Sequence, residues 1–522
     1  MNLTCDYLVI GSGAASLAFV DTLLEEMPHK QILLVDKKPS PGGHWVDAYG
    51  FVKLHQPSIV YGLASKSLEG SWAKLMFTKF TLPWKHRASK PEINTYFKSF
   101  VDSKTASGQL QYFPECVFDF GQELESSKIT TATFASLDGK LSYTVEIREK
   151  LVDGVRGECI IPSLSPPDFP VADGIHVITP NELHGMSRRG PPGSGKKEKH
   201  FVVLGAGKTA MDTVLFLQTA LKVNPSRNVS WVIPNDVWML SREESDGPVS
   251  YLHALLRADG DQDKACLAME AAGKFVRLEP GVLPTRFRFP MIGKDEVKLL
   301  RRVDDKIRRG RVLSIGLDGG RGGDIVVRFE QGQEDWVLSQ NGDREYVFVH
   351  CTSPGPFNGK ASDGVVFDSE RKMTLDLLYA PPISISMSCI AKLESALQQE
   401  TLDVAFGRIL LKNDAASPNE VLRQLIKGTG IQTSITNHDF LADMRSIITQ
   451  ASFMALLDHD PMVGYNWLKS NRLSMFSVPG FKGGVVEDMH MIVSKGKMSG
   501  SPPDQLEMIQ KIADKLEPLR GK

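Results

Sequence analysis

The feature that most constrains this chain is a pattern that occurs twice: an apolar strand, a glycine-rich turn, an amphipathic helix and a second apolar strand. In the first copy, an apolar run at residues 7–10 precedes the turn at residues 11–16, and an amphipathic stretch follows at residues 17–26. A second apolar run at residues 31–35 ends in Asp36. Strands that alternate with helices through short connections predict an α/β fold with parallel strands.

The first turn has the chemistry of a dinucleotide-binding turn. Gly11 permits a tight turn, Gly13 lets the backbone approach a pyrophosphate at the helix N-terminus, and Asp36 is placed to bind an adenosine ribose. Ser16 replaces the third glycine, where a small residue packs helix against strand, so the match is imperfect. The alternative is an ordinary strand–helix turn, which the strand, helix and acid in register disfavour. The predicted binding residues are Gly11, Gly13, Ala14, Ser16, Asp36 and Lys37.

The second copy lies in the middle of the chain. A strand at residues 201–204 leads to the turn at residues 205–210, and a helix precedes the strand at residues 229–233. Ala210 is an accepted substitute for the third glycine. NAD sites usually have an acid at the end of the second strand, but residues 233–235 are Ile-Pro-Asn, which favours NADP over NAD. The predicted binding residues are Gly205, Gly207, Lys208, Thr209 and Arg242, the last either as a ligand of the 2′-phosphate or as a surface arginine without a ligand.

The residues after Asp36 add a resemblance to a known class of enzyme. Pro41-Gly42-Gly43-His44-Trp45 follows the acid, and residues 51–58 end in Gln-Pro-Ser and lead to Tyr61. This order resembles the NADPH-dependent flavin monooxygenases, two-dinucleotide-domain flavoproteins that include N- and S-oxygenating and Baeyer–Villiger enzymes. In that group a G-G-x-W turn follows the acid, and a Pro-Ser-Tyr segment lies beside the isoalloxazine ring. The resemblance implies that Gly43, His44 and Trp45 belong to an FAD site, whereas taken singly they fit a loop turn and a core aromatic residue.

The resemblance implies a reaction as well as a fold. NADPH (or NADH) bound at the second turn would reduce FAD bound at the first, and the reduced flavin would combine with dioxygen to give a C4a-(hydro)peroxide that oxygenates a small organic substrate. Gln56 falls where related oxygenases have Asn or Asp beside the flavin, and His55 is a candidate for proton transfer near neutral pH. Because neighbours on a strand point to opposite faces, at most one of them is expected to face the flavin, and we favour Gln56.

One departure from the family keeps a second function open. The monooxygenase fingerprint F-x-G-x-x-x-H corresponds to residues 178–184, where His184 keeps the spacing but Ile178 and Pro180 replace the aromatic residue and the glycine. If the altered fingerprint means that the chain does not transfer oxygen, it would be an FAD-dependent oxidase or dehydrogenase of a small molecule, in which the nicotinamide site has a reduced role. A non-enzymatic, redox-sensing protein that binds the same cofactors is a third interpretation.

These motifs predict two Rossmann-like dinucleotide-binding domains and a mainly helical C-terminal extension. We expect residues 1–170 to form the first part of an FAD-binding domain, residues 171–345 a NAD(P)-binding domain that interrupts it, residues 346–416 the return segment and residues 417–522 the extension. A β-hairpin is predicted at residues 134–147 and a crossover strand at residues 159–163. In the extension, helices are predicted at residues 419–427, 439–458 and 502–516, which would cover the substrate side or form a homodimer contact.

Composition excludes several other classes of protein. The 522 residues include 61 Lys and Arg against 62 Asp and Glu, and a net charge of −1 offers no positive field for nucleic acid. No apolar run reaches the ~18 residues that a membrane helix needs, and the N-terminal sequence has no targeting signal. The six cysteines are scattered without metal-ligand spacing, which predicts buried, reduced thiols in a cytoplasmic protein without a metal site.

Overall fold

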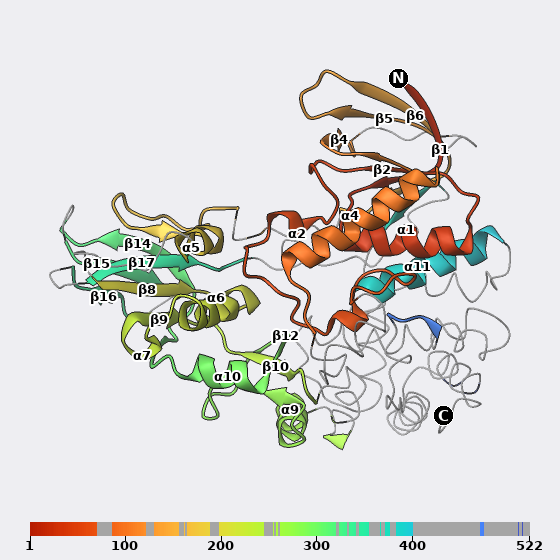
Figure 1. Ribbon diagram of the computed structural model, residues 1–522. Coiled ribbons are helices and arrows are strands. Elements are labelled where there is room, and N and C mark those ends of the chain that lie inside the picture. The colour runs from red at the N-terminus through yellow and green to blue at the C-terminus, as the bar shows by residue number, and fades with distance from the viewer. Residues whose placement is uncertain are drawn as a thin grey trace.

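The computed structural model describes residues 1–69, 86–121, 130–155, 161, 164–187, 198–244, 254, 257–258, 261–319, 323–330, 333–340, 344–353, 366, 371–375, 383–399, 470–473, 510 and 514. These residues form two α/β lobes, the first at the right of Figure 1 and the second at the left. The predicted crossover strand (apart from Ile161) and the three predicted helices of the extension (apart from residues 510 and 514) lie outside the described residues. The predicted α/β class is confirmed.

The first lobe is built on a sheet of strands β1 (Asn2–Ile10), β2 (Ile32–Val35), β3 (Leu110–Phe113), β4 (Cys116–Phe118), β5 (Thr130–Ser136), β6 (Ser142–Asp153) and β18 (Lys372–Thr374). Strands β3, β2, β1 and β6 lie in that order and run parallel, and β18 pairs in parallel with the end of β6. Strands β5 and β4 continue the sheet as an antiparallel meander, which confirms the hairpin predicted at residues 134–147.

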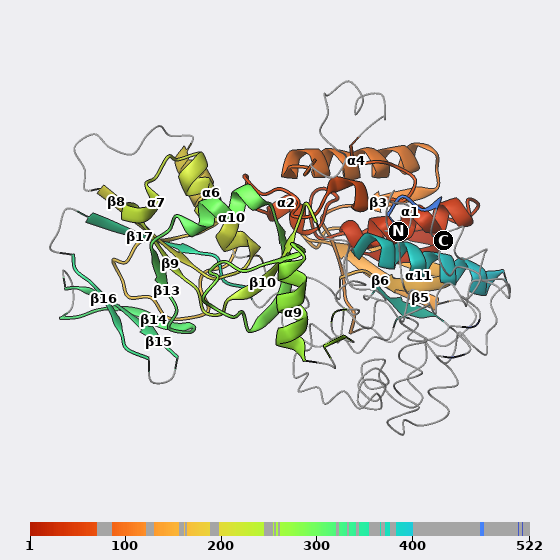
Figure 2. The ribbon, with the colours of Figure 1, turned by 90° about the horizontal axis from the view of Figure 1, so that it is seen from below.

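Three long helices cover this sheet: α1 (Ala14–Glu26), α4 (Lys90–Ala106) and α11 (Ile383–Gln398). The shorter helix α2 (His44–Asp47) and the single turn η1 (Ser58–Val60) lie in the connection between β2 and α4. Helices α1 and α11 lie side by side in Figures 1 and 2. The hydroxyls of Thr22 on α1 and Ser388 on α11 are 2.7 Å apart, and Lys392 of α11 pairs with Glu26 of α1 at 2.6 Å. Residues far apart in the sequence therefore share one helical layer.

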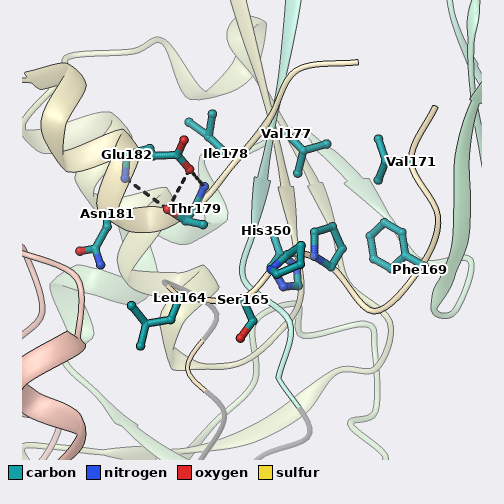
Figure 3. A pocket seen from close by; sticks show the side chains of 12 residues that line it. Leu164, Ser165, Phe169, Val171, Val177, Ile178, Thr179, Asn181, Glu182 and His350 are labelled. Carbon is teal, nitrogen blue, oxygen red and sulfur yellow. Dashed lines mark hydrogen bonds between the residues drawn. The ribbon is translucent and has the colours of Figure 1, made fainter. Parts of the chain in front are cut away.

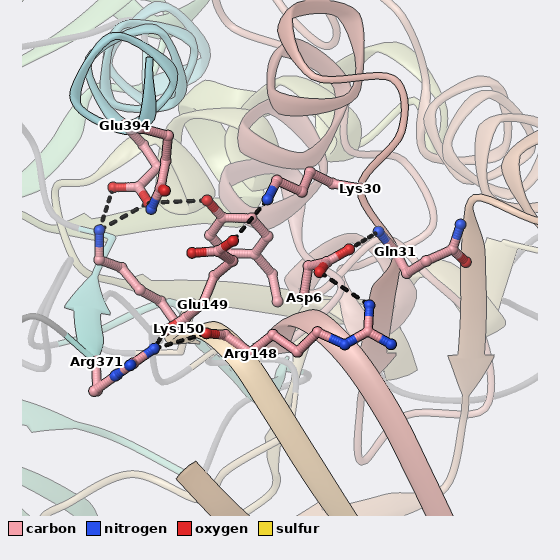
Figure 4. Close-up of polar contacts among 10 residues, drawn as sticks. Asp6, Lys30, Gln31, Arg148, Glu149, Lys150, Arg371 and Glu394 are labelled. Carbon is pink, nitrogen blue, oxygen red and sulfur yellow. Dashed lines mark hydrogen bonds and ion pairs between the residues drawn. The ribbon is translucent and has the colours of Figure 1, made fainter. Parts of the chain in front are cut away.

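A buried ionic group fixes α11 on the sheet (Figure 4). The carboxylate of Glu394 is fully buried and accepts hydrogen bonds from the ammonium of Lys150 on β6, at 2.6 and 2.8 Å, and from the hydroxyl of Tyr7 on β1, at 2.9 Å. Burial, together with the neighbouring Glu394 charge, raises the pKa of Tyr7, so its hydroxyl stays a donor. Because each charge is buried, loss of one partner would leave the other uncompensated at a cost of about 3–5 kcal/mol.

The second lobe repeats the plan of the first. Its parallel sheet has the order β13 (Asp305–Ile307), β9 (Val229–Val232), β8 (Glu198–Leu204), β17 (Arg344–His350) and β7 (Val177–Ile178). A three-stranded antiparallel sheet, made of β14 (Val312–Leu317), β15 (Ile325–Phe329) and β16 (Trp336–Leu338), shares an apolar core with it. Its helices are α5 (Pro180–Ser187), α6 (Lys208–Thr219) and α7 (Pro225–Asn228).

The structure places the predicted domain border at residue 345 inside a strand. Strand β17 begins at Arg344, and residues 344–350 pair with β8 in unbroken parallel register. This strand therefore belongs wholly to the second sheet, and the chain rejoins the first sheet later, at β18. Family likeness at the border rests on a short apolar run, and such a run does not reveal the sheet in which a strand pairs.

An insertion that the sequence did not reveal lies between the lobes in both views (Figures 1 and 2). It comprises β10 (Val237–Ser241), α9 (Gln262–Ala271), β11 (Phe275–Val276), β12 (Arg286–Ile292) and α10 (Lys294–Arg301). Trp238 is fully buried in the core cluster of the first lobe, while its neighbour Met239 is fully buried in that of the second. Because neighbours on a strand point to opposite faces, β10 packs into both cores at once.

Within the described part of the chain, no helix has the length and apolar character needed to span a bilayer. The five described cysteines, which are Cys5, Cys116, Cys266, Cys351 and Cys389, are buried free thiols, as predicted.

Candidate functional site: two glycine turns and the segment that joins them

The first glycine turn sits at the carboxyl edge of the first sheet. Gly11 has a φ of +93°, and its backbone N–H donates to the carbonyl oxygen of Val35 at 2.7 Å. Gly13 is the N-cap of α1, and no described side chain caps that helix. The edge is also reached by the ends of β6 and β18, since Gly154 N–H donates to Ile10 O at 2.9 Å and Leu375 N–H to Asp153 O at 2.8 Å. In open α/β sheets ligands bind at this edge, where strand order reverses.

The predicted G-G-H-W turn packs directly on the first glycine turn. A Cβ added to Gly43 would lie 2.7 Å from the Cα of Gly13, which is closer than side chains tolerate. The backbone of Gly43 has φ 58° and ψ −127°, a conformation that favours glycine. Gly42 N–H also donates to Ser12 O at 2.9 Å, so the two turns form one backbone surface. The chain needs glycine at position 43 for both reasons.

Ser16 and Gly154 explain how helix α1 meets the sheet. Ser16 is fully buried, and a Cβ at Gly154 would overlap its hydroxyl and lie 2.7 Å from the carbonyl oxygen of Ile10. Position 16 is therefore a close-packing position, as the fingerprint requires, and its small side chain fits. Ser16 Oγ has no hydrogen-bond partner within the described residues. Gly154 was not predicted, because a single glycine after an alternating strand gives no signal of its own.

Asp36 has a structural task that sequence analysis did not anticipate. Its Oδ2 accepts hydrogen bonds from the backbone N–H and the hydroxyl of Ser12, at 2.5 and 2.7 Å, and its Oδ1 accepts from Lys38 N–H at 2.8 Å. The side chain is buried, whereas Lys37 is exposed. Asp36 thus holds the glycine turn against the end of β2. Ribose binding by Asp36 stays a prediction, and it would use lone pairs that these bonds leave available.

The second glycine turn is more open than the first. Gly205 has a φ of +120°, and a Cβ there would lie 3.0 Å from the carbonyl oxygen of Cys351, whereas a Cβ at Gly207 would meet no described atom within 4 Å. Gly207 is the N-cap of α6, again without a side-chain cap among the described residues. Lys208 forms an ion pair with Asp212 one turn further along α6. The backbone around Gly207 is therefore accessible to a ligand.

A short segment after Gly43 connects the first turn to the second. The hydroxyl of Tyr49 donates to Oδ2 of Asp212 at 2.9 Å and also interacts with Thr209, so the start of helix α6 meets the first lobe. The ring of Phe51 stacks on Phe216 of α6 with centroids 4.1 Å apart and an interplanar angle of 13°. Only six positions separate Gly43 from Tyr49. The two glycine turns are consequently neighbours.

His184 belongs to the same contact between the lobes. It lies on α5 and packs against Gly50, where a Cβ would overlap its imidazole ring. Its ring centroid is 6.1 Å from that of Phe51 and 6.0 Å from that of Phe216. His184 therefore helps to join the lobes beside the second turn.

A second polar group also joins the lobes. The guanidinium of Arg242, at the end of β10, donates through Nε to the carbonyl oxygen of His55 at 3.0 Å and pairs with Glu296 of α10 at 2.8 Å. Arg87, from the first lobe, pairs with the same carboxylate at 3.0 Å. Met291 N–H donates to Nδ1 of His55 at 3.3 Å. Arg242 thus holds the segment that contains Gln56, and its predicted role as a 2′-phosphate ligand remains a prediction.

Two perturbed pKa values follow from this arrangement. Burial opposes ionisation of Glu296, but the cations Arg242, Lys208 and Arg87 outweigh it and lower the pKa of Glu296 to about 2. Burial, assisted by Lys208, Arg242 and Arg87, lowers the pKa of His55 to about 3. His55 is therefore neutral near pH 7 and accepts a backbone hydrogen bond, rather than titrating near neutral pH as the sequence suggested.

The remaining predicted residues lie along the segment between the turns. Trp45 is buried, and its Nε1 donates to the hydroxyl of Tyr61 at 2.6 Å. His44 is exposed with its ring centroid 5.1 Å from that of Trp45, and Ala14 is the first residue of α1. The Oε1 atom of Gln56 is buried and has no hydrogen-bond partner within the described residues, so this amide is available to a ligand.

A cavity of about 660 Å³ lies in the second lobe between the loop at residues 164–171, the start of α5 and the end of β17 (Figure 3). His350 lines it, and burial lowers the pKa of His350, so the imidazole is neutral. Glu182 accepts hydrogen bonds from the backbone N–H and the hydroxyl of Thr179 at 2.7 and 2.9 Å, so its carboxylate caps the N-terminus of α5. None of the described residues that line this cavity is a predicted site residue.

Sequence reasoning missed several residues of the site: Tyr49, Arg87, Gly154, Glu296 and Arg472. Each acts through a partner far along the chain, such as Asp212 for Tyr49 and the carbonyl oxygen of Leu63 for Arg472. A pattern within one segment does not show such a pairing. For Glu296, its place three residues after Gly293 gave a local signal, because its carboxylate accepts a hydrogen bond from the N–H of Gly293, the N-cap of α10, at 2.9 Å.

The fold and the site define a class of protein: an α/β protein in which two glycine turns, each at the start of a helix, are joined by one short segment. Uncharacterized proteins of Mycobacterium tuberculosis and Mycobacterium bovis are 30% identical to this chain over 417 residues, which is 77% of this chain and 69% of theirs. The chain belongs to the same protein family as these mycobacterial proteins. No protein-family model matches it.

The solved structures that show some likeness to this chain are named as two monooxygenases and an N-hydroxylase. The open crystal structure of cyclohexanone monooxygenase matches 77% of this chain and 89% of its own, with a TM-score of 0.44 and 14% identity. The ornithine N-hydroxylase of Kutzneria sp. 744 matches 72% of this chain and 88% of its own, with a TM-score of 0.42 and 13% identity. The polycyclic ketone monooxygenase of Thermothelomyces thermophila matches 100% of this chain and 89% of its own, with a TM-score of 0.46 and 12% identity. Because these likenesses are weak, we base the function on the residues of this chain.

Proposed function

We propose that this protein is an FAD-dependent monooxygenase that uses NADPH, with NADH as the alternative donor, to oxygenate a small organic substrate with dioxygen. One observation carries the proposal: the segment from Gly43 to Tyr49 touches both glycine turns. Gly43 packs on Gly13 of the first turn, and Tyr49 binds Asp212 on the helix of the second. A redox enzyme with two dinucleotides needs such neighbouring sites, because hydride transfer requires contact between the reacting rings.

The first turn fits the pyrophosphate of FAD. The N–H groups in the first turn of α1 have no partners within the helix, and Gly13 offers no side chain to cap them. An anion at this helix N-terminus would accept their hydrogen bonds and interact favourably with the helix dipole. Since a Cβ at Gly43 would collide with Gly13, the surface that meets the ligand consists of bare backbone. Asp36 and Ser12 hold this surface in shape.

The second turn fits the pyrophosphate of NADPH. A Cβ at Gly207 would enter space that is empty of described atoms, so the backbone there is open to approach. Helix α6 is 12 residues long and has no side-chain cap among the described residues, which leaves its first N–H groups for an anion. Lys208 adds a positive charge at the same helix end, partly neutralised by Asp212. Thr209 and Arg242 complete the proposed set of contacts.

When bound, FAD supplies the electron transfer and the reaction with dioxygen. The chain's own residues bind and orient. Gln56 presents a buried amide whose Oε1 accepts a hydrogen bond from the ligand, while neutral His55 keeps its segment in place through Met291. The hydrogen bond between Trp45 and Tyr61 joins the segment after the first glycine turn to the end of η1, and these residues form the proposed wall of the FAD site. His55 is assigned a positioning role, because its imidazole is neutral near pH 7.

The proposal is tested on the purified full-length protein. We expect FAD to be released on denaturation and NADPH consumption to be matched mole for mole by oxygenated product across a panel of ketones, amines and sulfides. Substrate oxidation that yields hydrogen peroxide without NADPH would favour the oxidase or dehydrogenase alternative, which the altered fingerprint at residues 178–184 motivated. Gly13→Val should abolish FAD binding while the protein stays folded; full FAD content in this variant would refute the first site.

A further inference from the structure

The loop at residues 61–66 is held by four different elements of the first lobe. Gly62 N–H donates to Ser384 Oγ of α11 at 3.1 Å, and Leu63 N–H to the hydroxyl of Tyr96 on α4 at 2.8 Å. Ser65 N–H donates to Asp21 of α1 at 2.9 Å. Trp45 of α2 donates to the hydroxyl of Tyr61, as described above. The loop follows η1, in the part of the chain that the family resemblance places beside the flavin.

Arg472, in the C-terminal extension, is the partner of two carbonyl groups of this loop. The guanidinium of Arg472 donates through Nη1 to the carbonyl oxygen of Leu63 at 2.5 Å and through Nη2 to that of Tyr61 at 3.1 Å. It therefore spans Gly62, which has a φ of +98° and no room for a Cβ because the Tyr96 hydroxyl would be 2.7 Å away. The planar fork of arginine can satisfy two acceptors at once, which the point charge of lysine cannot reproduce.

Residues on both sides of Arg472 fix its position. Asn471 donates through Nδ2 to Ser388 Oγ on α11 at 2.9 Å and accepts at Oδ1 from Leu473 N–H at 3.0 Å. Leu473 is fully buried in the core cluster of the first lobe, and Asn471 is 7% exposed. Burial lowers the pKa of Arg472, while Tyr96, Glu69 and Asp21 oppose this effect, so the guanidinium keeps its charge. Three consecutive side chains are thus inserted into the lobe.

A short chain of contacts links Arg472 to the first glycine turn. Arg472 binds the carbonyl oxygen of Tyr61, the hydroxyl of Tyr61 accepts from Trp45, and Trp45 lies two positions after Gly43, which packs on Gly13. Resting on the proposed function, we infer that Arg472 is a positioning residue for the FAD site, through which the C-terminal extension fixes the wall of that site. The described segment at residues 471–473 is then required for tight FAD binding.

The experiment compares FAD release from full-length holoprotein variants. We expect Arg472→Ala to release FAD at least tenfold faster and to change the circular dichroism of the bound flavin, with Arg472→Lys between it and the wild type. Arg301→Ala is the matched control, because the guanidinium of Arg301 also binds two backbone carbonyl oxygens, those of Leu278 and Arg277 at 2.8 Å, in the insertion of the second lobe. It should lower the thermal midpoint but leave FAD release unchanged.

The outcomes separate the inference from the function on which it rests. If the wild type binds no FAD, the proposed function is wrong and the inference is overturned with it. If the wild type binds FAD and Arg472→Ala releases it at the wild-type or Arg301→Ala rate, only the inference is overturned. If Arg472→Ala does not fold, Arg472→Lys decides by the same comparison. Tyr61→Phe, which alters the next contact in the chain, should also accelerate FAD release without adding to the effect of Arg472→Lys.

Discussion

Substitution of Gly43 by alanine tests whether the contact between the two glycine-rich segments forms the FAD site. The backbone at Gly43, with φ 58° and ψ −127°, lies in a region that other residues adopt at a cost of about 1–3 kcal/mol. The added Cβ would lie 2.7 Å from Gly13 Cα, a backbone atom that cannot turn aside, and overpacking of this kind costs about 1–3 kcal/mol.

The two costs together are about 2–6 kcal/mol. At about 1.4 kcal/mol per tenfold change, this predicts a loss of FAD affinity from about thirtyfold to about twenty-thousandfold. The loss falls on FAD affinity because the turn can relax only by moving Gly13 away from its present place at the start of α1. The assay is fluorescence titration of the full-length apoprotein with FAD, with urea unfolding measured in parallel.

Gly139→Ala is the control for the backbone cost alone. Gly139 has a φ of +70° in the β5–β6 hairpin, and a Cβ there would meet no described atom within 4 Å. The variant should lose about 1–2 kcal/mol of unfolding free energy, the usual cost of a left-handed residue, and keep its FAD affinity. If Gly43→Ala binds FAD as tightly as Gly139→Ala, Gly43 does not form part of the site and the reasoning is refuted.

Further expected outcomes concern the second turn and the polar group between the lobes. Gly207→Val should keep FAD but weaken NADPH binding at least tenfold, whereas Gly316→Val, where a Cβ also meets no described atom, should leave both unchanged in titrations. Arg242→Ala should slow reduction by NADPH more than by NADH in stopped-flow assays, because it removes a proposed contact of the 2′-phosphate, whereas Glu296→Gln should slow both equally. Equal slowing by Arg242→Ala would instead assign the arginine a positioning role alone. The pKa of Glu296 is about 2 against an ordinary value of 4.5, which corresponds to a stabilisation of the folded state of about 3 kcal/mol. This stabilisation is present above pH 4.5 and is lost as the pH falls towards 2. Glu296→Gln should therefore abolish that part of the pH dependence of urea unfolding. The pKa of His55 is about 3 against 6.5, so the folded protein loses stability as pH falls below 6.5, and His55→Asn should lose less than the wild type between pH 7 and 5.

Local patterns were sufficient to predict the two turns and the elements around them. The strand that ends at Ile10, helix α1 and strand β2 lie where the apolar runs and the glycine turn put them, and β8, α6 and β9 do so for the second copy. Glycine at position 43 was predicted as part of a turn, but the reason for it, contact with Gly13, is visible only in three dimensions. Spacing along the chain fixes the order of elements, since period and turn chemistry are local properties.

The rest depends on contacts between distant segments. Arg242 was predicted as a phosphate ligand from its place after the second strand, yet its partners Glu296 and His55 lie 54 and 187 positions away. The insertion between β9 and β13 has no family pattern, so the contact of Trp238 with the first core was not predictable. The sequence pattern shows that a side chain is charged or apolar but does not show which distant partner it meets, because tertiary packing determines that partner.

The distance between the two proposed dinucleotide sites is limited by the chain itself. Six residues, fully extended, span at most about 21 Å, and the segment from Gly43 to Tyr49 is shorter than this because residues 44–47 are helical. Tyr49 with Asp212, Phe51 with Phe216, and Arg87 with Glu296 then fix the second lobe at three separate points. A rotation that separated the turns would break an ion pair, a hydrogen bond and an aromatic stack together. We therefore expect that the two turns are held as neighbours before any ligand binds, so that binding energy need not be spent on bringing the lobes together.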